Sequence, residues 1–147
     1  MPTRKSDPVV GSVFFLDVPD IGQGYFSEAS GFGSESEVVE HKAVDSKGMP
    51  VIQKIPGRVK WDNITLRRGI TSDTALWQWR QKVIQGDIQG ARKNGSVVLL
   101  DREFKEVARF NFINGWPVSY KGADLKADDN NVVIEEVSIA HEGLERA

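Results

Sequence analysis

The chain has 147 residues, of which 39% are hydrophobic and 27% are charged, with a formal net charge of −2 and no cysteine. These values are typical of one globular domain, and they exclude a disulfide framework and cysteine-based metal or redox chemistry. The near-neutral charge offers no basic face for nucleic acid, and no apolar stretch approaches the roughly 20 residues of a membrane helix, so we expect no membrane insertion.

The first third of the chain predicts an arm followed by short strands. Residues 1–10 are polar, contain two prolines and lack the apolar segment of a signal peptide, so we expect a flexible arm before a single domain over residues 11–147. Alternating apolar and polar side chains predict a strand over residues 12–18. Two more short strands are expected on either side of Gly31-Phe32-Gly33.

Residues 41–56 are predicted to form a protruding hairpin with its tip at Asp45–Gly48. Beyond it, the apolar side chains of the following strand change register by one residue between Trp61 and Ile64. A slip of this kind predicts a β-bulge at Asp62-Asn63.

One helix is predicted over residues 73–86, with a capping residue among residues 71–73 and a stop at Gly86. On a helical wheel its apolar positions span roughly 200°, about twice the width that a surface helix needs to cover a core. We therefore expect one edge, at Trp79, to cover the core and the other edge, at Trp77, to face a partner.

The second half of the chain predicts further strands over residues 96–101, 106–113 and 116–121, then a polar loop over 124–131 and a last strand over 132–140 before a short tail. With about eight to ten short strands and one helix, the sequence predicts a mainly β protein. We expect a β-sandwich or barrel with the helix packed outside it.

Few residues suggest chemistry. His41 and His141 have no metal-ligand spacing, and the DDNN segment at 128–131 lacks the alternating ligands and closing glutamate of a calcium loop. Glu135 and Glu136 point to opposite sides of a strand, which favours a solvated face with an inter-strand or inter-subunit pair over an acid–base dyad. The sequence therefore predicts no enzyme, no metal and no cofactor.

Residues 60–79 (KWDNITLRRGITSDTALWQW) are rich in the arginine, tryptophan and branched apolar side chains of protein contact surfaces. This segment favours assembly over catalysis. A closed ring whose sheets join edge to edge would also remove the exposed edges of a small sheet. Two alternatives stay open, a β-barrel that binds a small ligand and a phage head–tail adaptor.

An ordered set of segments from about residue 11 to the C-terminus resembles the tail tube proteins of contractile injection machines, the T4-like phage tail tube family. The likeness is strongest to the inner tube subunits of extracellular contractile injection systems of the antifeeding-prophage and virulence-cassette type. Near Trp116 the family usually has Asn-Ala-Trp-Pro, whereas this chain has Asn114-Gly115. The matching segments are YFSEASG (25–31), IPGRVKWDNITLRRG (55–69), Ile70-Thr71, Leu76-Trp77-x-Trp79, RKNGSVVLL (92–100), VARFNF (107–112), Trp116-Pro117-Val118 and IAHEGLER (139–146).

The resemblance implies a type VI secretion tube-like architecture, in which hexameric rings stack into a hollow tube inside a contractile sheath. The sheets of six subunits would form one barrel around the lumen, with the helix outside. It further implies baseplate or spike and tube-terminator proteins as partners, and an effector protein or DNA as cargo. Assembly is expected in the cytoplasm, in a phage-tail-like particle that is released from the cell or anchored to a membrane.

Within this architecture we expect four sets of functional residues. Ring stacking is expected at the hairpin tip, at Asp45, Ser46, Lys47, Gly48 and Met49. Subunit contacts are expected at Arg67, Arg68, Arg92, Lys93, His141, Glu142 and Arg146. The sheath is expected to meet Trp77, Gln78, Gln81, Lys82 and Gln85. The lumen wall is expected to include Ser34, Glu35, Ser36 and Glu37, although charges here equally suit an edge strand guarded against aggregation.

Overall fold

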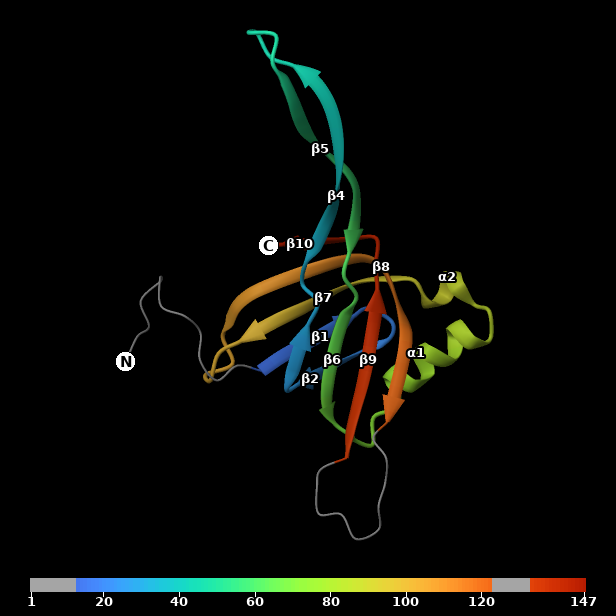
Figure 1. The fold of residues 1–147 in the computed structure, drawn as a ribbon. Helices are drawn as coiled ribbons and strands as arrows, with labels where there is room; N and C mark the ends of the chain where they lie inside the picture. The colour runs from blue at the N-terminus through green and yellow to red at the C-terminus, as the bar shows by residue number, and fades with distance from the viewer. Residues whose placement is uncertain (1–12, 123–132) are drawn as a thin grey trace.

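The computed structural model describes residues 13–122 and 133–147. The arm predicted over residues 1–10 and the polar loop predicted over 124–131 lie outside the described residues. Within them, the chain forms ten strands and two helices (Figure 1): β1 (Val13–Val18), β2 (Gly22–Phe26), β3 (Glu28–Ser30), β4 (Ser34–Val44), β5 (Pro50–Trp61), β6 (Ile64–Gly69), α1 (Ala75–Ile84), α2 (Ile88–Ala91), β7 (Lys93–Leu100), β8 (Glu106–Gly122), β9 (Ile134–Ala140) and β10 (Gly143–Arg146).

The main sheet runs in the order β2-β1-β7-β8-β9-β6-β3, and β10 pairs with β8. It folds back on itself because the first half of β8 pairs with β7 and the second half, from Trp116, pairs with β9. At the bend Asn114 has a φ of 50°, and a Cβ on Gly115 would lie 2.4 Å from the Phe112 ring. The two strands predicted over residues 106–113 and 116–121 are therefore one bent strand.

A second corner lies between β2 and β3. These strands occupy opposite ends of the path, since β2 pairs with β1 and β3 pairs with β6, yet only Ser27 separates them in the chain. The Ser27 backbone N–H donates to the Arg67 carbonyl at 3.0 Å. Strands that switch sheets at such bends form the corners of a sandwich. Of the two predicted forms, a β-sandwich or a barrel, the fold is thus the sandwich, because in the described part of the chain the hydrogen-bonded path does not close into a barrel.

The core lies between the two halves of the folded sheet. Fully buried apolar side chains of this kind each stabilise the fold by about 1.5–3 kcal/mol. They come from strands on both halves, which ties the sandwich together: Leu16, Val18, Phe26, Ile64, Leu66, Val97, Phe112, Val137 and Ile139.

Helix α1 covers one flank of the sandwich, with α2 beside it (Figure 1). At its start the Asp73 carboxylate accepts a hydrogen bond from the Ala75 N–H at 2.9 Å, and after it Gly86 has a φ of 89°. Trp79 is fully buried, and its Nε1–H donates to the Ala91 carbonyl of α2 at 2.6 Å. Trp79 is therefore the core anchor that the wheel predicted.

Strands β4 and β5 form a separate two-stranded sheet that rises away from the sandwich (Figure 1). Their pairing runs from Ser34 opposite Trp61 to Val44 opposite Pro50. The hairpin is thus longer at both ends than the predicted 41–56. At its tip the Asp45 carboxylate accepts from the backbone N–H groups of Lys47 and Met49, at 2.9 and 2.8 Å.

The prediction of a β-bulge at Asp62-Asn63 is wrong. Strand β5 ends at Trp61 and β6 begins at Ile64, so the change in apolar register marks the passage from the hairpin into the main sheet. A register shift does occur within the hairpin, between Ser36 and Val38. The tail expected after residue 140 also differs from the prediction, because it contains the short strand β10.

Candidate functional site

The described residues contain no reactive cluster. In residues 13–122 and 133–147, no three histidine, aspartate or glutamate side chains gather as metal ligands. A pocket beneath the start of α1 has a volume of about 10 Å³, room for one water molecule. A groove of about 440 Å³ beside β3 is open to solvent, and Arg67 at its rim is already paired with carboxylates. None of these is an enclosed site for a small ligand.

The hairpin carries the densest apolar surface in the described part of the chain. Seven of the sixteen exposed large apolar side chains lie on it, each 45–68% exposed: Val38, Val39, Val44, Met49, Ile52, Ile55 and Val59. A two-stranded hairpin alone in water is at best marginally stable. This surface is therefore suited to contact with another protein.

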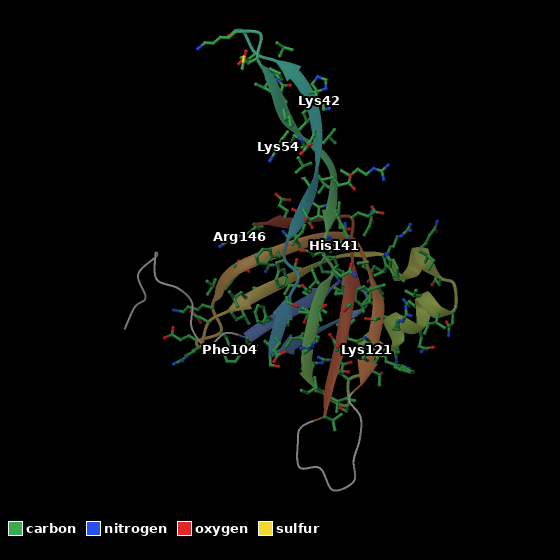
Figure 2. All side chains as sticks on the ribbon, in the orientation of Figure 1. Lys42, Lys54, Phe104, Lys121, His141 and Arg146 are labelled. Carbon is green, nitrogen blue, oxygen red and sulfur yellow. The ribbon has the colours of Figure 1, made fainter. Side chains whose placement is uncertain are left out.

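The two faces of the hairpin differ in charge. Residues opposite one another in an antiparallel pair share a face, and successive residues alternate between faces. In the outer half, what we call the uncharged face holds Val39, His41, Ala43, Val51, Gln53 and Ile55. The opposite, charged face holds Val38, Glu40, Lys42, Val44, Pro50, Ile52, Lys54 and Pro56 (Figure 2 labels Lys42 and Lys54).

His141 joins the hairpin to the sandwich (Figure 2). Its Nε2 lies 3.0 Å from the Asp62 carbonyl, and its ring lies 5.8 Å from Trp61 and 6.4 Å from Phe112. Nε2–H donates to this carbonyl, and the buried Nδ1 has no partner among the described residues. This predicted interface residue thus fixes the root of the hairpin within its own subunit.

The predicted sheath-facing residues follow α1. Trp77 is 51% exposed, and its ring packs edge-on against Tyr120 with 5.5 Å between centroids. Gln78 and Gln85 are exposed, whereas Gln81 and Lys82 are half-buried. The helix therefore presents a fixed aromatic ring among polar side chains.

Arg68 is buried, unlike the other interface candidates. Its Nε donates to Glu135 at 2.5 Å, and its guanidinium lies 4.7 Å from the centre of the Phe26 ring. The Tyr120 hydroxyl donates to the other oxygen of Glu135. Burial, reinforced by the hydrogen bond to Glu135, raises the pKa of Tyr120 to about 12. Arg68 therefore stabilises the subunit interior, and the prediction that placed it at a surface contact is corrected.

Arg67 is exposed and bridges three strands. It lies 3.2 Å from Glu136 on β9 and 3.5 Å from Glu28 on β3. The hydrogen bond to Glu136 raises the pKa of Arg67 above its usual value. Glu135 and Glu136 thus point to opposite sides, as the alternation predicted, and both form inter-strand pairs.

The other interface candidates do not form one cluster. Lys93 lies 3.8 Å from Asp20, and Glu142 accepts a hydrogen bond from the Asn114 side chain at 2.6 Å. Arg92 and Arg146 are exposed. The lumen candidates, all exposed, lie at the base of the hairpin on β4: Ser34, Glu35, Ser36 and Glu37.

An aromatic cluster that the sequence did not predict lies on the outer face of the sandwich. The Tyr25 ring lies 5.0 Å from Phe15 and 6.0 Å from Phe104, and Tyr25 and Phe104 are 54% and 62% exposed. Phe104 belongs to the turn between β7 and β8 (Figure 2). The available signal was a large aromatic residue within the polar turn DREFK.

A family model described as T4-like virus tail tube protein gp19 matches residues 12–145. No curated protein matches the sequence. None of the described helices is long and apolar enough to span a bilayer.

Solved structures share the fold. A chain of the PVC sheath-tube complex of an extracellular contractile injection system, in the extended state, superposes with a TM-score of 0.79 at 22% identity, covering 97% of this chain and 93% of that one. A chain of the anti-feeding prophage cap gives 0.75 at 21% identity, covering 100% and 95%. Hcp1 from Flavobacterium johnsoniae gives 0.55 at 17% identity, covering 92% and 94%.

Proposed function

The chain belongs to the T4-like virus tail tube protein family, and we propose that six copies form a ring and that rings stack into a hollow tube inside a contractile sheath. The tube conducts an effector protein or DNA when the sheath contracts. It is a structural conduit that catalyses no reaction. The observation that carries this proposal is the hairpin, which holds seven exposed apolar side chains away from a sandwich that is already packed.

The hairpin serves the stacking of rings. Its tip, Asp45–Met49, is held by hydrogen bonds to the Asp45 carboxylate, so it presents a defined shape to a neighbouring ring. Its length of 28 residues, 34–61, gives it reach beyond the sandwich. An obligate contact between rings needs a large buried area, typically above ~2,000 Å², and an apolar ribbon supplies part of it.

The face of α1 with Trp77 meets the sheath. This role is supported by the exposure of the two tryptophans: Trp77 is half-exposed, whereas Trp79, two residues further along the chain, is buried in the core. Similar folds occur in complexes of a sheath with a tube, in a tube-terminating cap and in a baseplate. We therefore propose sheath, terminator and baseplate or spike proteins as partners, in a particle that is assembled in the cytoplasm.

The lumen wall includes the base of the hairpin at Ser34–Glu37. Arg67, Arg92, Lys93, Glu142 and Arg146 contribute to contacts between subunits. Exposure supports both assignments for every residue except Lys93, which is half-buried, although Arg67, Lys93 and Glu142 also have partners within the subunit.

Deletion of Lys47–Pro50 tests the stacking role. The purified variant should give folded subunits or single rings that do not extend into tubes, as seen by size-exclusion chromatography and negative-stain imaging. Lys121→Ser, on strand β8 of the sandwich, is the control and should still form tubes. Tubes of normal length from the deletion variant would contradict the proposal.

A further inference from the structure

We propose that the aromatic cluster of Phe15, Tyr25 and Phe104 receives the uncharged face of the hairpin from a second copy of this chain. The inference rests on the proposed tube function, because that function makes the hairpin the element offered to a neighbouring copy. It adds the surface on the neighbour that the hairpin contacts.

The cluster forms a continuous aromatic surface on three elements. Phe15 on β1 stands directly opposite both Tyr25 on β2 and Val98 on β7, so the three side chains share the outer face of the sheet. Phe104 meets the Tyr25 ring edge-on from the β7–β8 turn. Aromatic side chains are enriched at protein contacts, and Tyr25 and Phe104 are 54% and 62% exposed in the subunit.

The turn holds Phe104 outward at a conformational cost. The Asp101 carboxylate accepts from the backbone N–H groups of Glu103 and Lys105 at 2.8 and 3.0 Å, and the Phe104 N–H donates to the Asp101 carbonyl at 3.0 Å. Phe104 has a φ of 62°, a region that favours glycine and is strained for a bulky side chain. The hairpin turn itself requires this left-handed backbone, but the ring lies outside the buried core and stays 62% exposed, so it is available for a contact with another chain.

The distribution of charge favours one face of the hairpin as the partner of the aromatic cluster. Four charged side chains near the cluster already form pairs, Lys105 with Glu103 at 3.4 Å and Arg109 with Glu106 at 2.8 Å. A ribbon without formal charge can therefore cover the rings without leaving a buried charge unpaired. The uncharged face of the hairpin meets this condition, whereas the charged face would bring Lys42 and Lys54 onto the aromatic surface.

Symmetry also favours this pairing. A stack of identical copies grows through a contact between two different surfaces, so that each copy both gives and receives. The hairpin and the aromatic cluster are two such surfaces, on separate parts of the molecule (Figure 2).

Cysteine crosslinking tests the contact, because the natural chain has no cysteine. Gln53→Cys on the uncharged face and Arg102→Cys beside Phe104 are combined in one chain, and assembled protein is oxidised mildly. We expect a ladder of covalent multimers, trimers and above, on a denaturing gel, because each copy links to the next. The matched controls Gln53→Cys with Gln78→Cys, and Lys42→Cys with Arg102→Cys, should give no ladder. Equal ladders in the controls, or none from the first pair in assembled tubes, would overturn the proposal.

Phe104→Gly supplies an independent measurement. Glycine relieves the positive φ, so the thermal midpoint of the isolated subunit should stay the same or rise. The subunit concentration for half-maximal tube formation should rise about tenfold or more. An unchanged assembly concentration, or a lowered subunit midpoint with normal assembly, overturns the receiving surface alone. A wild-type chain that forms no tubes overturns the tube function and this inference together.

Discussion

The sandwich and the hairpin differ in how far their side chains are buried. In the sandwich, side chains from both halves of the sheet are buried together, and even the interior charges of Arg68 and Glu135 are paired. In the hairpin nearly every residue is exposed, although many are apolar. The sandwich therefore obtains its stability within the subunit, whereas in the proposed tube the hairpin is completed by contact with another chain.

The two tryptophans of α1 give the largest expected effect. Trp79→Ala should lower the free energy of unfolding of the isolated subunit by about 3–5 kcal/mol, since it removes a buried ring and its hydrogen bond to Ala91. Trp77→Ala should change it by less than about 1 kcal/mol, because half of that ring is already in water. Urea unfolding of both variants measures the difference. Equal losses of unfolding free energy in the two variants would contradict the assignment of Trp79 to the core and of Trp77 to a partner contact.

The paired glutamates of β9 provide the next contrast. Glu135→Gln leaves the buried Arg68 charge without its partner and should destabilise the subunit by about 3 kcal/mol. Glu136→Gln, next to it in sequence, disturbs only the solvent-screened pair with Arg67 and should destabilise the subunit much less than Glu135→Gln. Chemical denaturation at neutral pH measures both. A Glu136 variant as unstable as the Glu135 variant would contradict the assigned burial.

Local sequence patterns predict much of the sandwich. Alternation and turn residues locate most strands, and the wide apolar arc separates Trp79 from Trp77. The failures are non-local. Asn114-Gly115 looks like a turn between two strands, but it is a bend within β8, because pairing on either side continues with different neighbours.

The functional surfaces were harder to predict than the fold. The charged residues 34–40 are typical of an edge strand, so their pattern did not predict that they belong to the lower half of the hairpin. Arg68 resembles a surface residue beside Arg67, and its partner Glu135 lies 67 residues away in the chain. Phe104 sits in a polar turn, and only the fold brings Tyr25 against it.

Alkaline pH should weaken the interior in a way that the hairpin does not share. The pKa of Tyr120 is raised from its usual 10.0 to about 12 in the folded subunit. The unfolded chain thus releases this proton first, so the contribution is fully present below about pH 10 and is lost as pH rises toward 12. Comparing Tyr120→Phe with the natural chain by urea unfolding at pH 8 and pH 11 isolates it. A difference between the two proteins that is the same at both pH values would show that the tyrosine pKa is unshifted.

The hairpin should show the smallest effect on subunit stability. Ile55→Ser, on the exposed uncharged face, should change the free energy of unfolding by no more than about 0.5 kcal/mol. The same variant should reduce tube formation, and Ile55→Val, which keeps an apolar contact, should largely preserve it. Imaging and urea unfolding of the two variants check this pair. A loss of several kcal/mol in the isolated Ile55→Ser subunit would place the residue in an intramolecular core.

Hydrogen exchange of the hairpin amides tests most directly whether partner contact completes the hairpin. Backbone amides of β4 and β5 are measured in isolated subunits and in assembled tubes, with the buried strand β9 as internal reference. If partner contact completes the hairpin, we expect fast exchange in the outer hairpin of the subunit and strong protection in tubes, while β9 is protected in both. Hairpin amides that are already as protected as β9 in the isolated subunit, or that stay unprotected in tubes, would contradict it.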